Sequence, residues 1–270
     1  MALGTLVLVG GGRMGAAIIA GLIASGEADA SAIRVAEPDP ARQSALASAH
    51  GVRCAADAAE LLPGADVVVL AVKPQVIDEV VLALAAHIPA SALVVSIAAG
   101  ISCAHLEGLL APGAPVVRVM PNTPAMVRQG MAVISAGSAA DADDVETVRR
   151  MFAALGKAVV LDESLQDAAT AISGSGPAYM ALVVDALAAA GAEHGLPRDV
   201  AQVLAVQTMR GTADLLDGTG QTPAELIAAV SSPGGTTVAA LAEFESGGLR
   251  ETFAAGVAAA VARAGELGGR

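Results

Sequence analysis

Short runs of aliphatic residues alternate with amphipathic stretches through the first part of the chain. The runs are rich in Val and Ile, which is typical of buried strands. The stretches between them, such as Arg13–Ser25 and Asp141–Leu155, place apolar residues at helical spacing. Alternation of this kind predicts a mostly parallel sheet with helices on both faces, an α/β fold. The predicted strands are Leu6–Val9, Ile33–Ala36, Val67–Val72, Leu93–Ile97, Val116–Val119, Met131–Ile134 and Ala158–Leu161.

The pattern changes after Asp162, beyond which no comparable strand is predicted. Several of the helices expected there, including Pro177–Ala192 and Glu251–Ala264, are apolar nearly all round, and a domain of this size has little capacity to bury them alone. We therefore predict an α/β domain over residues 1–161 and an all-helical domain over residues 162–270 that a second subunit covers. The predicted helices of this half are 164–172, 177–193, 197–217, 223–230, 236–245 and 249–267.

Composition narrows the classes of function. The chain of 270 residues is 54% hydrophobic and 1% aromatic, and its formal net charge is -12. An acidic surface repels the phosphate backbone of nucleic acids. With so few aromatic rings, there is also little for bases to stack on. Nucleic-acid binding is therefore not expected. Cys54 and Cys103 form neither a disulfide framework nor a metal-ligand pattern, which predicts a reducing compartment and no metal site.

The apolar segments indicate a cytoplasmic protein. The first residues run directly into the predicted strand Leu6–Val9, with no basic segment or cleavage site of a signal peptide. The most apolar later stretch, Ala178–Ala192, is shorter than a membrane span and contains Asp185. We expect this stretch to be a buried helix and the protein to have no membrane partner.

A glycine-rich segment, Gly10–Gly15, follows the first predicted strand and opens the first predicted helix. Gly10 allows a tight turn, Gly12 lets a pyrophosphate approach the backbone, and Gly15 lets helix and strand pack closely. The pyrophosphate would lie at the positive end of the helix. A glycine-rich turn without a ligand is the alternative, and the strand and helix on either side make it the weaker one. The predicted dinucleotide site includes Gly10, Gly12, Arg13, Met14 and Gly15.

The choice between NAD and NADP stays open in this pattern. Glu37 ends the second predicted strand, where an acidic residue accepts from the ribose 2′-hydroxyl and favours NAD. A solvated glutamate before a Pro-Asp-Pro turn is the alternative interpretation. Arg13, Arg34 and Arg42 lie close in sequence and could instead bind the 2′-phosphate of NADP.

Three further segments end predicted strands: Ala71–Pro74, Ser96–Gly100 and Met120–Pro124. Ligands of open α/β sheets bind at the carboxyl ends of the strands, and small residues there leave room for a nicotinamide ring. Lys73 could be an ordinary surface lysine. Its place at this edge of the sheet makes a functional role an equally good interpretation.

Two glycine-rich loops interrupt the helical half, Ser173–Pro177 and Ser231–Thr237. The second runs directly into a predicted helix, so its N–H groups and hydroxyls could bind a carboxylate. An ordinary helix cap is the alternative. Consecutive glycines beside hydroxyls favour anion binding.

A missing acid also points to a type of reaction. Reduction of a ketone needs a positioned proton donor, but no lysine follows Lys157, and His194 lies at a predicted helix end where capping explains it. An imine nitrogen can arrive already protonated, so hydride addition develops no oxyanion. A hydroxyl such as that of Thr237 could then orient the ring nitrogen. This pattern favours an imine reductase over a ketone reductase.

Taken together, the motifs resemble those of pyrroline-5-carboxylate reductases along nearly the full chain. The two loops of the helical half, in this order and spacing, are the most specific part of the resemblance. The matching segments are Gly10–Gly15, Ala71–Pro74, Ser96–Gly100, Met120–Pro124, Ser173–Tyr179 (SGSGPAY), Ser231–Thr237 (SSPGGTT) and Glu245–Arg250 (ESGGLR).

The resemblance implies a Rossmann domain followed by an all-helical dimerisation domain, with active sites close to the dimer interface. It implies reduction of 1-pyrroline-5-carboxylate to L-proline, the last step of proline biosynthesis, by a homodimer of a kind that commonly assembles into decamers. NADPH is the expected hydride donor and NADH the alternative. Thr237 and Lys73 are the expected catalytic residues. The expected substrate-binding residues are Ser175, Ser232, Gly234, Gly235, Thr236 and Thr237, and the cofactor-binding residues beyond the glycine-rich segment are Glu37, Ala71, Val72, Lys73, Pro74, Ala98 and Asn122.

Two departures from the family pattern bear on these expectations. Glu37 stands where many relatives carry a neutral polar residue suited to a 2′-phosphate, and Leu226–Val230 lacks a basic–acidic pair that relatives often show. Three alternatives stay open: a hydroxyacid dehydrogenase, which the missing lysine disfavours; a reductase of other cyclic imines; and a non-catalytic sensor that binds a dinucleotide. The intact Ser231–Thr237 loop disfavours the sensor.

Overall fold

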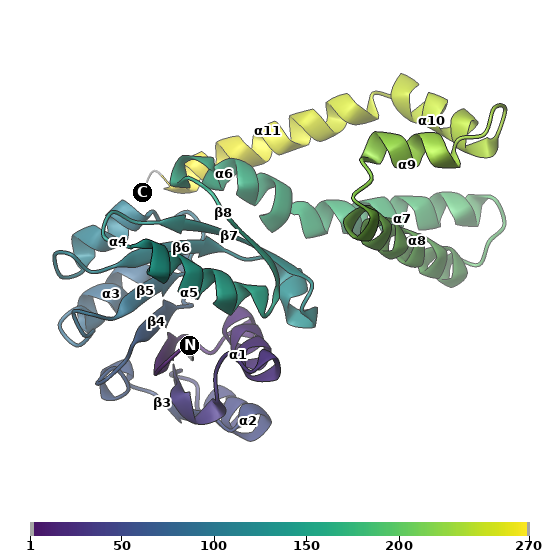
Figure 1. Ribbon diagram of the computed structural model, residues 1–270. Coiled ribbons are helices and arrows are strands. Elements are labelled where there is room, and N and C mark those ends of the chain that lie inside the picture. The colour runs from purple at the N-terminus through teal and green to yellow at the C-terminus, as the bar shows by residue number, and fades with distance from the viewer. Residues whose placement is uncertain (1–2, 269–270) are drawn as a thin grey trace. The chain divides into compact units, whose positions relative to one another are not determined.

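Residues 3–268 are described by the computed structural model, whose contacts divide the chain into two compact units (Figure 1). Unit 1 contains the residues up to Ser175 together with those from Ala260 onward, and unit 2 contains Gly176–Ala259. Strands and helices alternate in unit 1, whereas unit 2 is helical.

Unit 1 is built on an eight-stranded sheet of order β3-β2-β1-β4-β5-β6-β7-β8. The strands from β3 to β6 pair in parallel, β6 pairs with β7 in the antiparallel sense, and β7 pairs with β8 in parallel. The carboxyl ends of β1, β4, β5 and β6 therefore meet at one edge of the sheet. The strands are β1 Leu6–Val9, β2 Ile33–Ala36, β3 Arg53–Ala55, β4 Val67–Leu70, β5 Leu93–Ser96, β6 Val116–Met120, β7 Gly130–Ala136 and β8 Gly156–Val160.

Helices cover both faces of this sheet, as the period of the strands requires (Figure 1). Leu6 and Leu8 of β1 belong to the core that includes residues of α1 and α5, whereas Val7 and Val9 belong to the core that includes residues of α3 and α4. Both cores consist almost entirely of aliphatic side chains. The helices of unit 1 are α1 Arg13–Ser25, α2 Pro40–His50, α3 Ile77–Leu84, α4 Cys103–Leu109, α5 Ala142–Ala153 and α6 Gln166–Ala169, and the last turns of α11 Leu249–Gly268 belong to it as well.

Most predicted strands and helices agree with this structure, apart from small shifts at their ends. The strand β3 was not predicted, because only three residues of an edge strand pair there and they carry no alternating pattern. A second difference follows Asp162. The single helix predicted over 164–172 consists of a 3₁₀ turn Glu163–Leu165, the short α6, and a π turn Thr170–Gly174.

The segment after Asp162 belongs to unit 1, although the domain boundary is predicted at 161/162 from the end of the strand pattern. The reason is packing of polar groups against the sheet. Arg118 of β6 is nearly buried and pairs with Glu163 at 3.1 Å and with Asp167 at 3.9 Å. The Glu163 carboxylate also accepts from the N–H of Cys103 at 2.9 Å. The compact units thus divide at Ser175/Gly176, farther along the chain than the strands do.

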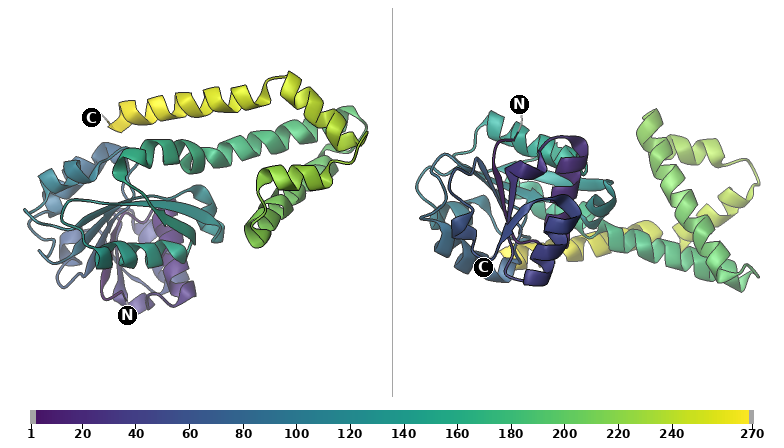
Figure 2. Two further views of the ribbon diagram at one scale, coloured as in Figure 1. Left: turned by 45° about the horizontal axis from the view of Figure 1, so that its top comes forward. Right: turned by 90° about the horizontal axis from the view of Figure 1, so that it is seen from below.

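Unit 2 consists of helices whose starts follow from local sequence. Helices α7 and α8 form a hairpin through residues 194–197 (Figure 2). Thr222 and Glu225 form a capping box, with Pro223 in the first helical position of α9. The helices are α7 Gly176–Glu193, α8 Arg198–Thr219, α9 Pro223–Val230, α10 Thr236–Ser246 and the first part of α11.

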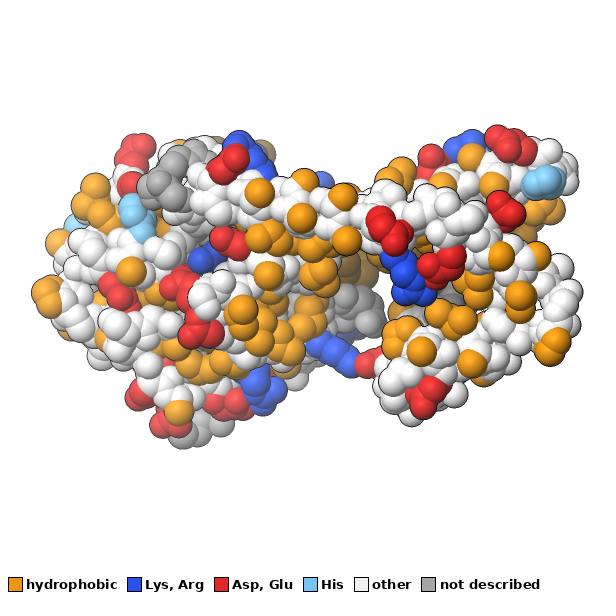
Figure 3. Space-filling model, turned by 90° about the horizontal axis from the view of Figure 1, so that it is seen from above, with side chains coloured by type: hydrophobic (Ala, Val, Ile, Leu, Met, Phe, Trp, Pro, Cys, Tyr) orange, Lys and Arg blue, Asp and Glu red, His pale blue; other side chains and the backbone are white. Residues whose placement is uncertain are grey.

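Few side chains of unit 2 are buried, and many of its large apolar ones are exposed (Figure 3). One helical run among residues 3–268, Glu163–Glu193, is 31 residues long and apolar enough to cross a membrane. Ala178–Ala192 is part of this longer run, because 163–175 extends the predicted helix, and the expectation of a buried helix is not met in the single chain, where only 17% of the apolar window is buried. Asp185 lies within the run and pairs with Arg198 at 2.6 Å, a charged pair of a kind that is rare in lipid-facing helices.

Candidate functional site

The glycine-rich segment after β1 has the backbone geometry that a dinucleotide site needs. Gly10 has a φ of +105°, and a Cβ there would lie 2.7 Å from the carbonyl oxygen of Ala71. A Cβ at Gly15 would collide with the carbonyl oxygen of Gly10 and lie 2.9 Å from Leu8. A Cβ at Gly12 would meet no atom within 4 Å, so the space beside this residue is open. Gly10 and Gly15 are thus required by the fold, whereas Gly12 leaves room for a ligand.

The first turn of α1 has no side-chain cap. Gly12 is its N-cap and makes no side-chain hydrogen bond, since it has no side chain. Helices α2, α4, α5 and α9, in contrast, each begin with an Asp, Ser or Thr side chain that accepts from their first N–H groups. The free N–H groups at the start of α1, together with the helix dipole, favour a bound anion. Arg13 is exposed and Met14 half-buried in this first turn.

Glu37 is buried beside the glycine-rich segment, with 3% of its surface exposed. Its Oε2 accepts from the N–H of Gly11 at 3.0 Å, and its Oε1 accepts from the N–H of Asp39 at 3.0 Å. The interpretation of Glu37 as a solvated residue before a turn is therefore wrong. The carboxylate holds the glycine-rich segment against the end of β2, which is the place where a ribose of the cofactor would lie in a fold of this type.

The three arginines of this region have different environments. Arg34 donates to the carbonyl oxygens of Leu61 at 2.8 Å and Pro63 at 2.7 Å, so its guanidinium is engaged with the main chain. Arg13 and Arg42 line one cavity of about 400 Å³ that also borders Gly11 and Gly12. Arg42 lies 3.7 Å from Glu37. Two of the three arginines are thus placed beside the glycine-rich segment, and Arg42, absent from the predicted cofactor-binding residues, is one of them.

The other predicted cofactor residues follow the ends of neighbouring strands. Ala71 continues β4 and donates its N–H to Val9 at 2.8 Å, directly beside Gly10. Ala98 is buried after β5, and Asn122 follows β6. Lys73 is exposed at the same edge, at the start of the 3₁₀ turn Pro74–Val76. The sheet order therefore brings these segments to one edge, together with the predicted Val72 and Pro74, which are half-buried.

The Ser231–Thr237 loop forms a tight turn and an open helix start in unit 2. The N–H of Gly235 donates to the carbonyl oxygen of Ser232 at 2.9 Å, and Gly234 has a φ of +71°. Pro233 and Gly234 thus fill the two central positions of a turn that favours these residues. Gly235 is then the N-cap of α10, again with no side-chain cap. The N–H groups of the next residues, Thr236 among them, stay available to an anion.

Hydroxyl groups gather around this helix start. Thr237 lies in the first turn of α10 and is half-buried, and Ser232 is exposed. The Oγ of Ser231 is buried and has no hydrogen-bond partner among residues 3–268. Buried hydroxyls without a hydrogen-bond partner are rare in folded proteins. Ser231 is absent from the predicted substrate-binding residues, although it is the first residue of the Ser231–Thr237 loop.

Ser175 belongs to a different unit from the other predicted substrate-binding residues. It is the last residue of unit 1 before the chain enters unit 2, and its N–H donates to Thr170 at 2.9 Å across the π turn. The dinucleotide residues also belong to unit 1, whereas Ser232, Gly234, Gly235, Thr236 and Thr237 belong to unit 2.

The cysteines and acidic groups offer little other chemistry. Burial, with Glu163 nearby, raises the pKa of the Cys103 thiol to about 12, so the thiol stays neutral and is a poor nucleophile at neutral pH. Burial also raises the pKa of Cys54. Among residues 3–268, no three or more His, Cys, Asp or Glu side chains are grouped so that they could hold a metal ion.

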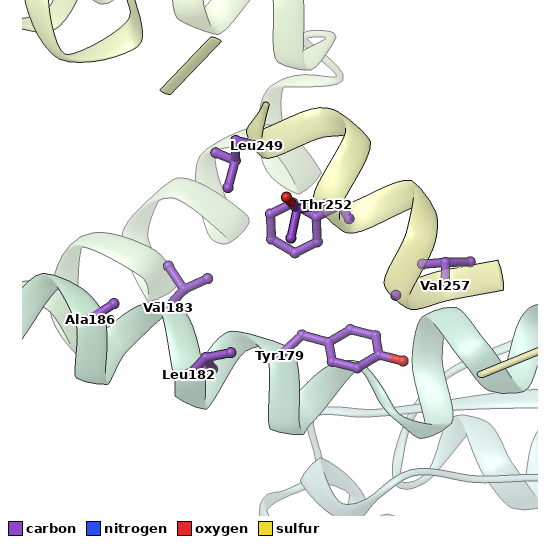
Figure 4. A pocket seen from close by; sticks show the side chains of 9 residues that line it. Tyr179, Leu182, Val183, Ala186, Leu249, Thr252 and Val257 are labelled. Atoms are coloured by element: carbon purple, nitrogen blue, oxygen red, sulfur yellow. The ribbon is translucent and has the colours of Figure 1, made fainter. Parts of the chain in front are cut away.

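An apolar pocket of about 360 Å³ lies between α7 and α11 within unit 2 (Figure 4). Leu182 and Val183 of α7 line it together with Leu249 and Phe253 of α11. The side chain of Tyr179 lies between the two helices (Figure 4). Leu182 is 69% exposed in the single chain. Apolar side chains that surround an open pocket on exposed helices are typical of a surface that another protein covers.

Comparisons with known proteins agree with both parts of this arrangement. A family model described as "Pyrroline-5-carboxylate reductase dimerisation" matches residues 163–267, and one described as "NADP oxidoreductase coenzyme F420-dependent" matches residues 5–100. The pyrroline-5-carboxylate reductase of Synechocystis sp. is 43% identical over 97% of this chain and 98% of its own length. That of Corynebacterium melassecola is 42% identical over 98% of both chains.

Solved structures are similar over the same extent. A pyrroline-5-carboxylate reductase from Coxiella burnetii matches with a TM-score of 0.94 and 36% identity, over 98% of both chains. A pyrroline carboxylate reductase from Plasmodium falciparum, solved with NADP bound, matches with a TM-score of 0.87 and 28% identity over 99% of both chains. By sequence and fold along almost its entire length, this chain belongs to the pyrroline-5-carboxylate reductase family.

Proposed function

We propose that this protein reduces 1-pyrroline-5-carboxylate to L-proline with hydride from a reduced nicotinamide dinucleotide. The observation that carries the proposal is the start of α10, where a glycine N-cap leaves N–H groups free beside the hydroxyls of Ser232 and Thr237. Such a helix start can bind a carboxylate without any basic side chain. The activity named for the relatives of this chain supports the same substrate.

Residues of unit 1 would hold the cofactor. The uncapped first turn of α1 and the open space beside Gly12 fit a pyrophosphate. The small residues Ala71 and Ala98 at the strand ends leave space for a nicotinamide ring. When bound, the dinucleotide supplies the hydride. Lys73, exposed at this edge, would attract a negative group and is proposed as a second catalytic residue.

Residues of unit 2 would orient the substrate. Ser232, Gly234, Gly235 and Thr236 would hold the carboxylate through N–H groups and hydroxyls at the start of α10. Thr237 would hold the protonated ring nitrogen by accepting its N–H at Oγ1. Because the ring nitrogen is already protonated, the imine carbon can accept the hydride without a proton from the protein. This suits a helical half whose sequence contains no lysine. Ser175 is proposed as a further substrate-binding residue.

The cofactor is proposed to be NADPH, with NADH as the alternative. Arg13 and Arg42 beside the cavity at Gly11 and Gly12 favour a 2′-phosphate, whereas the Glu37 carboxylate opposes one. The NADP found in the Plasmodium falciparum relative supports NADPH. The ratio of rates with the two cofactors decides between them.

The family model over residues 163–267 supports assembly through the helical half. For this protein we propose a homodimer in the cytoplasm, further assembly of dimers into decamers, and a functional division into a dinucleotide-binding part, 1–161, and a dimerisation and substrate-binding part, 162–270. Light scattering of the purified protein checks the assembly. A mass of one chain would overturn the dimer, and a mass of two chains would overturn the decamer.

The first experiment measures oxidation of NADPH and of NADH, by loss of absorbance of the reduced nicotinamide, with and without 1-pyrroline-5-carboxylate. We expect consumption that depends on the imine and produces proline. Equal consumption of a six-membered cyclic imine carboxylate would place the protein among reductases of wider specificity. If the folded protein binds a dinucleotide but consumes none with any cyclic imine, the proposal fails and a sensor is favoured instead.

A further inference from the structure

The side-chain amide of Asn122, just after β6, is used in two directions. Its Nδ2 donates to the carbonyl oxygen of Ser173 at 3.0 Å, and its Oδ1 accepts from the N–H of Met131 at 2.8 Å. Asn122 also precedes the 3₁₀ turn Thr123–Val127, but its side chain makes no capping hydrogen bond there, which is the usual role of asparagine in that position. The amide therefore joins three separate stretches of the main chain.

The carbonyl of Ser173 has a particular need for this donor. In a continuous α-helix it would accept from the N–H four residues farther on, which belongs to Pro177, and proline has no N–H. At this point the helical run also changes from α-helical to π-helical hydrogen bonding, in the turn Thr170–Gly174. Single π turns inside helices are frequent at functional sites. The Asn122 amide supplies the N–H donor that Pro177 lacks.

A second contact lies beside this hydrogen bond. A Cβ at Gly174 would lie 3.1 Å from Cε of Met120, at the end of β6, and 3.2 Å from Cγ2 of Thr170. The π turn thus packs closely against the strand end at Met120 and is hydrogen-bonded to it at Asn122. Ser175 follows directly, and its N–H closes the π turn on Thr170.

We propose that Asn122 is a positioning residue: its amide fixes the π turn Thr170–Gly174 and thereby Ser175, and it does not hold the cofactor. This inference rests on the proposed function, in which Ser175 binds the substrate, and it reassigns Asn122 from the predicted cofactor-binding residues. The role requires a donor and an acceptor in one side chain. Aspartate, when ionised, keeps the acceptor and loses the donor, and alanine loses both.

The test compares Asn122→Asp and Asn122→Ala in the full-length chain. Loss of a hydrogen bond to a half-buried carbonyl lowers kcat/KM for the imine by about 10- to 100-fold, while the Kd of the dinucleotide changes by less than about threefold. Gln129→Ala is the matched control, since Gln129 is an exposed side-chain amide in the same connection between β6 and β7. A dinucleotide Kd that rises in step with the loss of activity would make Asn122 a direct cofactor ligand and overturn the proposal.

The pH profile adds a signature that a simple loss of packing would not give. When protonated, an aspartate at position 122 has an O–H donor as well as acceptors, so it can replace the amide. The activity of Asn122→Asp relative to the unchanged protein should therefore rise as the pH falls toward about 4, the ordinary range of aspartate. Asn122→Ala should show no such recovery, and equal profiles for the two variants would contradict the role.

Amide hydrogen exchange separates this inference from the proposed function. Both Asn122 variants should exchange the amide of Ser175 at least about tenfold faster, because the π turn loses its external hydrogen bond. Unchanged exchange at Ser175 would overturn the positioning role, whatever the enzyme assay gives. If the unchanged protein fails to reduce the imine while exchange at Ser175 still accelerates in the variants, the proposed function fails and the fixing of the π turn stands.

Discussion

The start of α1 and the start of α10 are similar in sequence and differ in their surroundings. Each is led by glycines, and neither has a side-chain cap. Around α1, Gly11 and Gly15 are buried in a finished core, whereas α10 contains no buried residue and Gly234 and Thr236 are exposed. One chain therefore completes the α1 start by itself, while the α10 start lies in a unit with little core of its own.

Two helix starts of similar sequence can therefore depend on different levels of structure. The α1 start is held by a parallel sheet with two aliphatic cores, so it forms whenever unit 1 folds. The α10 start belongs to a unit whose apolar surfaces are open in the single chain, and such helices gain most of their stability from packing rather than from propensity. We therefore expect dinucleotide binding to survive changes that abolish turnover.

The largest effect is expected from Leu182→Asp in the apolar pocket of unit 2. Burying an unpaired charge costs about 4 kcal/mol, which weakens dimerisation by about 1,000-fold. Turnover should be lost with the dimer, whereas dinucleotide binding by unit 1 should persist. Analytical ultracentrifugation and a binding titration measure the two properties.

Leu82→Asp is the matched control for that variant. Leu82 of α3 is 62% exposed, close to the 69% of Leu182, but it lies on unit 1. The control should remain dimeric and active. A dimer that survives Leu182→Asp would show that the pocket is not part of the interface, and the contrast between the two helix starts would lose its explanation.

The next effect is expected from Gly12→Val, which fills the open space beside the start of α1. Because a Cβ there meets no atom within 4 Å, the protein should keep its melting temperature and its dimer. Dinucleotide affinity should fall at least about 100-fold, since the pyrophosphate can no longer reach the N–H groups. Gly108→Val, at another open position, is the control. Unchanged affinity would contradict the assignment of this segment to the cofactor.

Thr237→Ala tests the corresponding start of α10. We expect kcat/KM for the imine to fall by about 10- to 100-fold because one hydrogen bond to a charged group is lost. Dinucleotide affinity should not change, since Thr237 belongs to the other unit. Thr237→Ser keeps the hydroxyl and should keep most of the activity. Full activity of the alanine variant would remove Thr237 from the site.

The smallest effect is expected from Glu37→Gln, which removes a buried charge and keeps the shape of the side chain. The ratio of kcat/KM for NADPH to that for NADH should rise by about tenfold, because a carboxylate no longer opposes the 2′-phosphate. Glu60→Gln, an exposed carboxylate of the same unit, should leave the ratio unchanged. A falling ratio would mean that Glu37 acts by holding Gly11 rather than by its charge.

Local patterns predicted much of the fold because they depend on neighbours in the chain. The boundaries of β1, β2 and α1 follow directly from short aliphatic runs and from helical spacing. The start of α9 follows from its capping box, since Thr222 and Glu225 lie within one helical turn. The glycine-rich segment was interpretable for the same reason.

Long-range contacts explain where prediction stopped. Nothing near Glu37 in the sequence indicates that its carboxylate binds the N–H of Gly11, 26 residues away. By sequence, Arg34 is as suited to a phosphate as Arg42, but in the fold its guanidinium donates to the carbonyl oxygens of Leu61 and Pro63. The apolar helical run Glu163–Glu193 is longer than either helix predicted there, because the π turn Thr170–Gly174 joins the predicted helices 164–172 and 177–193.

The alternation of strands and helices and the two glycine-led helix starts follow from the sequence alone, since each depends on residues within a few positions of one another. Tertiary structure alone decided which polar groups meet: Glu37 with Gly11, Arg118 with Glu163, and Asn122 with Ser173. These pairs are separated by 26, 45 and 51 residues. Hydrogen bonds of this kind form only after the sheet has brought distant segments together, so no local pattern encodes them.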